Sequence, residues 1–273
     1  MASRTLAVCS WSLRPRDPAE LVSRLRAAGL QAVQLDLTPL VDDPATWGGV
    51  MKVLAGAGIR VVSGMMRPRG EDYASIPSIR ETGGFRRDDL WSENQRLAST
   101  VADLAARHDV RLVTFHGGFL PDDATDPLHG TMIERLQRVA DLFAGAGVQV
   151  ALETGQESAS GLRQALQRLA RGTVGVNLDP ANMLLYGAGD PLAAIRMLAP
   201  WVRQVHAKDA VGSGEPDVWG RETSVGVGAV PWPEFMAEVR RLPPDVCVVI
   251  EREGGERRVE EVAAARAFLQ PML

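Results

Sequence analysis

The 273-residue sequence predicts an α/β protein in which a closed (β/α)₈ TIM barrel forms a single domain over residues 1–273. The first observation is a repeated order of segments: an amphipathic run, then a glycine, then a short β-rich run. Three stretches show this order, namely LVSRLRAAGLQAVQLDL, VMKVLAGAGIRVVSG and RVADLFAGAGVQVALETG. Glycine is favoured just after a helix because it adopts the left-handed conformation there. Helices that alternate with strands through such short loops indicate parallel βαβ units.

The second observation is the number of these units. We expect eight strands, near residues 5–10, 32–37, 59–64, 110–116, 148–153, 174–179, 202–207 and 246–251. We expect eight helices, near residues 17–28, 44–57, 88–108, 130–146, 159–171, 190–199, 231–241 and 257–269. Asp17 before Pro18 and Asp190 before Pro191 have the pattern of an N-cap followed by proline in the first turn.

The alternative fold is an open, doubly wound sheet. That fold normally carries a glycine-rich phosphate loop after its first strand. Here the first strand runs into CSWSLRP, which contains no glycine. Two long segments, residues 65–88 and 209–230, follow the C-terminal ends of strands three and seven. Barrel enzymes build their sites on that face, so we expect these segments to form lids or substrate walls.

Composition excludes several classes of function. A formal net charge of −4 and a pI of about 5.7 argue against a dedicated nucleic-acid binder. No apolar run approaches the ~18–20 residues of a membrane span, and the N-terminus has no signal-peptide core. Cys9 and Cys247 do not form a CxxC pair, so a redox motif or a zinc knuckle is not indicated. We expect a cytoplasmic protein with both thiols reduced, and, in a closed barrel, both cysteines buried on adjacent strands.

Four predicted strands end in a side chain that can bind a metal. They are Glu153 in VQVALETG, Asp179 in VGVNLDP, His206 in VRQVHAKD and Glu251 in VCVVIERE. A charge does not fit the middle of a strand buried on both faces, but it fits the C-terminal mouth of a parallel sheet. The separations of 26, 27 and 45 residues match one βα repeat, or one lengthened by a loop. We therefore expect strands five to eight to bring these residues together.

A set of three carboxylates and one imidazole is suited to one divalent metal ion. We favour Mn²⁺, with Mg²⁺, Co²⁺ or Zn²⁺ as alternatives. Taken singly, each residue has an ordinary explanation. A carboxylate at a strand end usually caps a helix or faces solvent, and a histidine on an apolar strand is usually a hydrogen-bonded core residue. The occurrence of all four residues at the ends of predicted strands nevertheless favours the metal site.

Other polar groups are expected at the same rim. His116 could bind substrate, ligate a second metal, shuttle a proton or be structural. Asn182 could bind a sugar hydroxyl or cap the next helix. Lys208 could face an oxyanion or be a surface lysine. Glu157 and Trp11 are further substrate-binding candidates, and Trp11 could stack on a sugar face or pack the barrel mouth.

A family resemblance rests on eight stretches in order along nearly the whole chain. They are CSWSL, GEDYASIPSIRETGGF, VTFHGGF, ALETGQE, VNLDPANMLLYG, VHAKD, WGRETSVGVG and VIERE. With these the chain resembles the sugar-phosphate isomerase/epimerase group of xylose isomerase-like TIM barrels, which includes ketose 3-epimerases and AP-endonuclease-like nucleases. The resemblance implies a metal held by Glu153, Asp179, His206 and Glu251. It also implies that Glu153 and Glu251 are the catalytic acid/base pair.

The chain departs from the family pattern at two positions. Relatives with epimerase or nuclease activity often have histidine where this chain has Asn182, which argues against a multi-zinc nuclease. Many relatives have a polar or acidic residue between two late-loop glycines, where Val227 lies between Gly226 and Gly228. This second departure argues against a polar role for that loop.

The expected activity is metal-dependent isomerisation or epimerisation of a sugar or keto-sugar, by proton transfer next to a carbonyl through an enediolate. One alternative is a metal-dependent lyase or dehydratase that acts on a keto-polyol of the inosose or dehydroshikimate type. Another is a non-catalytic sugar-binding barrel. The partner is a small-molecule sugar or polyol, without nucleic acid or membrane. Relatives often form dimers or tetramers, so a homo-oligomer remains open.

Overall fold

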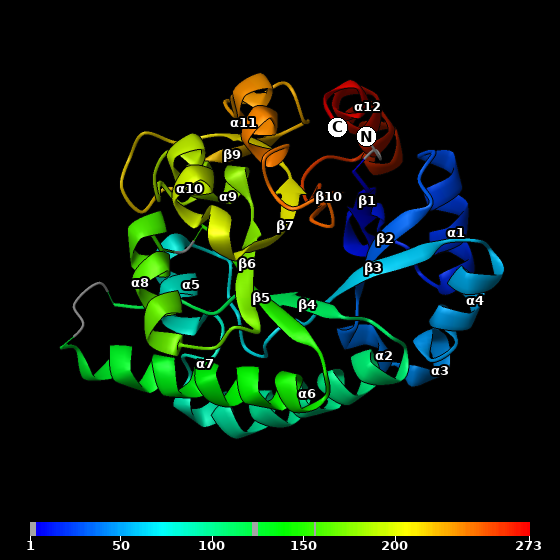
Figure 1. The fold of residues 1–273 in the computed structure, drawn as a ribbon. Coiled ribbons are helices and arrows are strands. Elements are labelled where there is room, and N and C mark those ends of the chain that lie inside the picture. The colour runs from blue at the N-terminus through cyan, green and yellow to red at the C-terminus, as the bar shows by residue number, and fades with distance from the viewer. Residues whose placement is uncertain (1–3, 122–124, 156) are drawn as a thin grey trace.

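The computed structural model describes residues 4–121, 125–155 and 157–273. Eight parallel strands form a closed barrel in the order β1-β10-β7-β6-β5-β4-β3-β2 (Figure 1). Their bounds are β1 Leu6–Cys9, β2 Ala32–Asp36, β3 Arg60–Met65, β4 Leu112–Phe115, β5 Gln149–Glu153, β6 Val174–Leu178, β7 Val202–Ala207 and β10 Cys247–Ile250. The predicted closed (β/α)₈ barrel is confirmed.

The barrel closes where the first strand meets the last. Strand β1 pairs with β10 in parallel, with Leu6 opposite Val248 and Val8 opposite Ile250. The two cysteines therefore lie on adjacent strands, as predicted, and both are free. Cys9 is buried but Cys247 is only half-buried, so the expectation that both are buried is wrong. Cys247 begins its strand at the N-terminal end of the barrel, where a neighbouring hollow reaches it.

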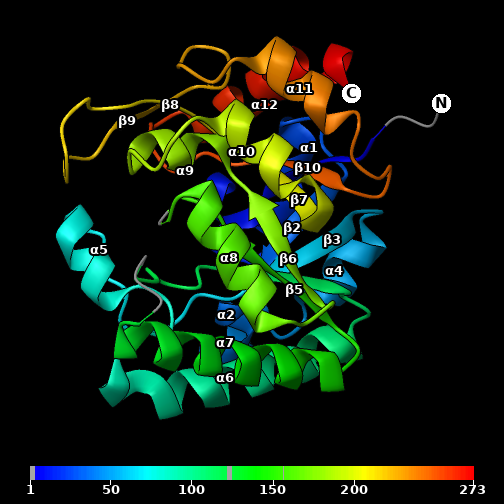
Figure 2. The ribbon, with the colours of Figure 1, turned by 60° about the vertical axis from the view of Figure 1, so that its left-hand side comes forward.

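Helices surround the barrel on the outside (Figure 2). Those that connect consecutive barrel strands are α1 Pro18–Ala27, α4 Val50–Gly56, α6 Asp88–Arg107, α7 Pro127–Gly145, α8 Ala159–Leu169, α10 Pro191–Leu198 and α11 Trp232–Val239, and α12 Arg258–Leu269 follows the last strand. Shorter helices are α2 Thr38–Asp42, α3 Pro44–Trp47, α5 Ile76–Thr82 and α9 Pro180–Leu185, with 3₁₀ turns at Ser10–Leu13, Ala199–Trp201 and Gln270–Met272. No helix in the described ranges is both long and apolar enough to cross a membrane.

Local sequence explains where these helices begin and break. Asp17 caps α1 by accepting a hydrogen bond from the Glu20 amide at 2.8 Å, as predicted. The expected helix over 44–57 is instead divided into α3 and α4 around Gly48 and Gly49, because glycine weakens a helix interior. Helix α7 begins three residues earlier than predicted, because Asp126 provides a cap of the same kind before Pro127.

The two long segments contain elements that the sequence analysis did not predict. Helix α5 lies within residues 65–88. Residues 209–230 contain an antiparallel hairpin of β8 (Asp209–Val211) and β9 (Arg221–Thr223). Such short elements carry little periodicity, so a loop and a three-residue strand look alike in sequence.

The carboxylate of Asp209 fixes the end of this second segment. It accepts hydrogen bonds from the amides of Gly226 at 2.8 Å and Gly228 at 3.0 Å, and from Trp232 Nε1 at 2.9 Å. A Cβ on Gly228 would lie only 2.1 Å from Asp209 Oδ1, so the main chain must approach closely here. Val227 between the glycines is 71% exposed. Main-chain amides therefore hold the loop, which needs no polar side chain at position 227.

The barrel interior below its C-terminal mouth is polar. Ser63 Oγ donates to Gln204 Oε1 at 2.5 Å, and Gln204 Nε2 donates to Asn177 Oδ1 at 3.2 Å. Gln34 Nε2 donates to Thr114 Oγ1 at 2.7 Å. All five side chains are buried. Because these groups pair with one another, their burial costs little. Asn177 and Gln34 extend these hydrogen bonds to Glu153 and His206, two of the four predicted strand-end residues.

Candidate active site

The four strand-end residues meet at the C-terminal mouth of the barrel. Glu153 ends β5, Asp179 follows β6, His206 lies in β7 and Glu251 follows β10. These four strands are consecutive neighbours in the barrel. The imidazole lies at the centre of the group. Its Nδ1 is 3.4 Å from Glu153 Oε1, 3.7 Å from Asp179 Oδ2 and 3.3 Å from Glu251 Oε2.

This group could hold a divalent metal ion. One potential ligand atom from each of the four residues lies within 4.8 Å of all the others, and all four side chains are buried. Among the described residues, neither His206 Nδ1 nor Asp179 Oδ2 has a hydrogen-bond partner. Buried polar atoms are nearly always satisfied, so these two atoms indicate a missing partner between the carboxylates and the ring. A divalent cation fits that position and those donor types.

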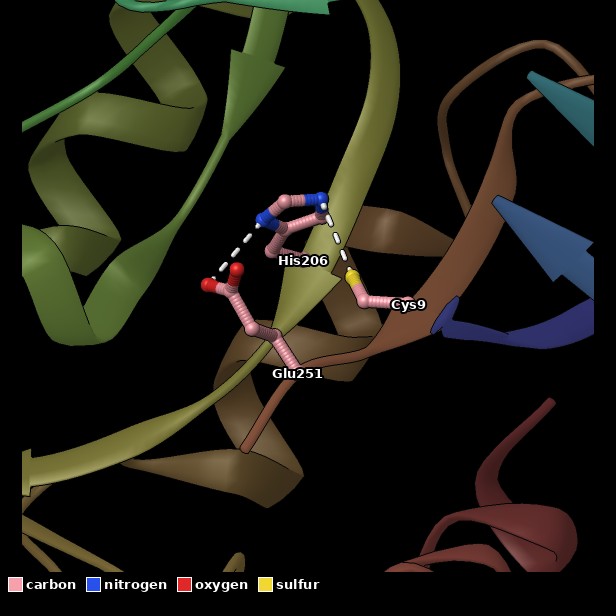
Figure 3. A group of neighbouring side chains, drawn as sticks. All are labelled: Cys9, His206 and Glu251. Carbon is pink, nitrogen blue, oxygen red and sulfur yellow. Dashed lines mark hydrogen bonds and ion pairs between the residues drawn. The ribbon is translucent and has the colours of Figure 1, made fainter. Parts of the chain in front are cut away.

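Gln34 sets the orientation of the imidazole. The Gln34 amide nitrogen faces Thr114 Oγ1 and the main-chain oxygen of Gly64, which can only accept. Its oxygen therefore faces His206 Nε2, at 2.7 Å. Cys9 Sγ also lies 3.7 Å from Nε2 (Figure 3). Asn177 Nδ2 also lies 3.1 Å from Nε2, but the Gln34 oxygen is the nearer partner, so we assign a proton to Nε2. Nδ1 then faces the carboxylates, and a hydrogen bond at the other ring nitrogen commonly orients a metal-binding histidine in this way.

Gln34 is not among the site residues predicted from the sequence. The available signal was an amide side chain within the apolar strand AVQLD, and Asn177 in VGVNLD gives the same signal. Asn177 Nδ2 lies 3.4 Å from Glu153 Oε2. A polar residue in the middle of a buried barrel strand can therefore indicate a group that supports the site.

Burial and charge compete in setting the protonation of the group. Burial opposes ionisation of Glu251, but Lys208 and His206 outweigh it and hold its pKa well below the ordinary value. His206 and His116 likewise lower the pKa of Glu153 against the effect of burial. Burial raises the pKa of Asp179 to about 6, despite the opposing effects of His206 and Lys208.

The charge of His206 follows from the same carboxylates. Burial would lower the pKa of its imidazolium, but the neighbouring negative charges raise it well above the ordinary value. Cys9 is not a source of that charge, because burial raises the pKa of its thiol and keeps it neutral. Without a metal ion, His206 is therefore a cation that balances Glu153 and, together with Lys208, Glu251.

Hydrogen bonds fix the two glutamates and the aspartate. Trp11 Nε1 donates to Glu251 Oε1 at 2.8 Å, so the indole packs at the mouth. Asn182 Nδ2 donates to Glu153 Oε1 at 3.0 Å. Asp179 caps α9 through Oδ1, which accepts from the amides of Ala181 at 2.8 Å and Asn182 at 2.9 Å, and this leaves Oδ2 free to face His206.

Lys208 is not a surface lysine. It is only 2% exposed. Its ammonium donates to Glu251 Oε2 at 3.1 Å, to Asn182 Oδ1 at 3.2 Å and to a carboxylate oxygen of Glu253. The surface alternative is thus wrong, because position 208 follows His206 with the same strand parity and its side chain also enters the mouth.

A cavity of about 530 Å³ lies above the four-residue group. Two of its lining residues, Glu153 and Glu251, belong to that group. The others are Trp11, Met65, Arg67, Glu71, Tyr73, His116, Asn182, Leu185, Tyr186, Lys208, Trp219 and Glu253. The cavity thus includes His116, Asn182, Lys208 and Trp11, four of the five candidates for substrate binding.

Glu157 is the fifth candidate, and the structure does not bring it into this lining. It borders a neighbouring hollow of about 440 Å³ that also includes Arg80, Arg86 and Tyr186. Conversely, Glu71 and Tyr73 line the cavity although the sequence analysis did not select them. Both come from the long segment after β3. In such a segment the side chains do not alternate between two faces, so the sequence does not indicate which of them point into the cavity.

His116 lies at the cavity wall beside Glu153. Its Nε2 is 4.0 Å from Glu153 Oε2, and its Nδ1 is buried without a hydrogen-bond partner among the described residues. Glu71 accepts a hydrogen bond from Tyr73 Oη at 3.2 Å and from the Gly84 amide at 2.9 Å. His116 and Glu71 thus form a polar part of the cavity wall beside Glu153.

Two comparisons with known proteins identify the same family. A family model described as xylose isomerase-like TIM barrel matches residues 22–272. A xylose isomerase domain protein from Planctomyces limnophilus is 27% identical, with a TM-score of 0.86 over 92% of this chain and 91% of that chain. None of the curated proteins matches this sequence significantly.

Two more distant structures share the fold. The probable 3-DHS dehydratase AsbF from Bacillus anthracis is 15% identical, with a TM-score of 0.73 over 97% of this chain and 98% of that chain. D-Psicose 3-epimerase from Clostridium cellulolyticum H10, solved with D-tagatose, is 16% identical, with a TM-score of 0.73 over 98% of this chain and 99% of that chain.

The environment of Lys208 generates a first prediction. Lys208→Met should remove one of the two cations beside the buried carboxylate of Glu251 and lower the free energy of unfolding by about 3–5 kcal/mol. Urea denaturation of the metal-free protein measures this effect.

A surface ion pair provides the control. Arg196 Nε lies 2.8 Å from Glu238 Oε1 and its side chain is 58% exposed, so Arg196→Met should change stability by less than about 1 kcal/mol. Equal losses in the two variants would show that the Lys208 pairs contribute no more than a surface pair does.

Proposed function

The chain belongs to the xylose isomerase-like TIM barrel family, and from this premise we propose that it is a divalent-metal-dependent isomerase or epimerase of a sugar or keto-sugar. The observation that carries the proposal is the position of two ionised glutamates. Glu153 and Glu251 both contact the central imidazole and both line the cavity. Two carboxylates beside one bound substrate are what proton transfer next to a carbonyl requires.

We propose that Glu153, Asp179, His206 and Glu251 hold the ion, with Mn²⁺ favoured for this mixture of oxygen and nitrogen donors. When bound, the ion would act as a Lewis acid that polarises the substrate carbonyl and stabilises the enediolate. Asn182 and Asn177 hold the carboxylate of Glu153, while Trp11 holds that of Glu251.

The glutamates carry the proton. Glu153 removes the proton from the carbon beside the carbonyl. In an isomerisation the same carboxyl returns it to the adjacent carbon. In an epimerisation Glu153 keeps that proton. Glu251, which is ionised before substrate binds, must first take up a proton from water and then supplies it to the opposite face. The strands β5 and β10 that carry them are separated by β6 and β7, so the two carboxyls approach a ligand from different sides.

A second candidate is a metal-dependent dehydratase that acts on a keto-polyol of the inosose or dehydroshikimate type. The similarity in fold to the probable 3-DHS dehydratase AsbF favours its consideration. Its first step is the same proton removal, after which a β-hydroxyl leaves as water. Loss of water from the product separates this reaction from isomerisation. A barrel that binds sugar without catalysis would give neither product.

Metal content gives the most direct prediction. Protein purified without chelator should contain about one divalent ion per chain, and Asp179→Ala should lose it. Elemental analysis measures both. Asp190→Ala is the matched control, because Asp190 also caps a helix, through the amides of Leu192 at 3.0 Å and Ala193 at 3.2 Å, but lies outside the group. Metal that persists in Asp179→Ala would contradict the assigned ligands.

Metal affinity should rise with pH. The pKa of His206 is raised well above its ordinary value, so the metal-free ring is protonated at neutral pH and must release one proton when Nδ1 binds an ion. Affinity should therefore rise about tenfold per pH unit between about pH 6.5 and 8. Below about pH 6 the slope should increase, because Asp179, whose pKa is about 6, must also lose a proton.

Competition with a chelating dye across this pH range measures the slope. The same titration of His108→Ala serves as a control, since His108 lies at the end of α6. A metal affinity that does not change between about pH 6.5 and 8 would exclude His206 as a ligand that must lose a proton.

The catalytic role of Glu153 is tested by exchange of the substrate C–H hydrogen with deuterated water. Glu153→Gln should slow this exchange by about 10²–10⁴-fold at saturating Mn²⁺, because the amide cannot accept the proton. NMR measures the rate, and elemental analysis establishes that metal is present. Glu134→Gln on the surface of α7 is the control. Full exchange activity in metal-loaded Glu153→Gln would remove Glu153 from this role.

A further inference from the structure

The ammonium of Lys208 has no hydrogen left for a ligand. An ammonium group has three N–H donors. Here they are directed to Glu251 Oε2 at 3.1 Å, to Asn182 Oδ1 at 3.2 Å and to Glu253. Two of these partners are carboxylates, so the positive charge is also neutralised. Lys208 therefore cannot bind an anionic group of a substrate unless it releases one of them.

The other permanent cation of the described lining is Arg67, and it is paired as well. Its guanidinium lies 2.7 Å from Asp36 Oδ2, just outside the cavity. Four carboxyl groups line the same space, those of Glu71, Glu153, Glu251 and Glu253. Among the described lining residues, carboxyl groups thus outnumber permanent cations, although a divalent ion held by Glu153 and Glu251 would offset two of the negative charges. Burial raises the pKa of Glu71, because ionisation is disfavoured away from water.

A phosphate ester would bring about two more negative charges into this space. Phosphate sites in proteins normally supply arginine forks, free lysines or a cluster of main-chain amides. The cavity lining has four carboxyl groups, which only accept hydrogen bonds when ionised, and its two permanent cations already pair with carboxylates. Hydroxyl groups donate to such oxygens, and the buried Nδ1 of His116 is without a partner. Trp11 and Trp219 give aromatic walls for the apolar face of a ring or carbon chain.

We propose that this cavity selects an uncharged polyhydroxylated carbonyl compound and rejects its phosphate ester, and that Glu253 determines this selectivity by holding Lys208. The reaction at that compound rests on the proposed function, whereas the selection by charge is a property of binding. Like charges placed together cost enough to weaken binding of the ester by more than about 100-fold.

Calorimetric titration of the Mn²⁺-loaded protein tests the selection directly. The probes are free ketohexoses, including D-tagatose, and an inosose, each compared with its phosphate ester. We expect at least one free compound to bind, with its ester weaker by more than about 100-fold. Equal or tighter binding of the ester, or no binding of any free compound, would overturn the proposal.

Deuterium exchange in the same samples separates this inference from the proposed function. Selective binding without exchange would contradict proton transfer while it supports selection by charge. Exchange on the ester and not on the free compound would support proton transfer while it overturns the selection. The two proposals therefore fail in different experiments.

Glu253→Gln tests the residue that we assign. Removal of this carboxylate leaves Lys208 with one carboxylate partner, so binding of the ester should improve by about 10-fold relative to the free compound. Glu256→Gln is the matched control, since Glu256 is exposed in the same loop. An unchanged ratio in Glu253→Gln, or the same change in Glu256→Gln, would show that Glu253 does not set the selectivity.

Discussion

The arrangement of the mouth depends on one buried imidazole between three carboxylates and one amide oxygen. Gln34 holds Nε2 of His206 from below, and the carboxylates approach Nδ1 from above. The hydrogen bonds of Gln34 continue to Thr114, and those of Asn177 continue to Gln204 and Ser63. The barrel interior is therefore part of the site. An apolar interior would pack equally well but would leave the ring without a fixed orientation.

Much of this could be predicted from sequence because a parallel barrel imposes order on it. Each strand ends at the same mouth, so a polar residue at the end of a β-rich run has a known destination. Glu153, Asp179, His206 and Glu251 were found in this way, and the structure brings them together. The closed barrel followed from the count of units and from the absence of glycine in the loop after the first strand.

What sequence could not predict lies where periodicity is absent. Glu71 and Tyr73 belong to a loop, so no parity shows that they line the cavity. Glu157 follows Glu153 closely in sequence, yet it borders a separate hollow. The sequence left Lys208 between a substrate-binding residue and a surface lysine, because its partners, Glu251 and Glu253, come from the far end of the chain. Pairings of that kind depend on three-dimensional proximity.

In the loop around Val227, the groups that fix the conformation are different from the side chain that is exposed at the tip. Its conformation depends on the main chain of Gly226 and Gly228 and on the side chain of Asp209, while the tip projects into solvent. The side chain at position 227 can therefore vary while the hydrogen bonds from Gly226 and Gly228 to Asp209 are kept. It is also a suitable point for attaching a fluorescent label, because a group placed there would extend away from the anchored main chain.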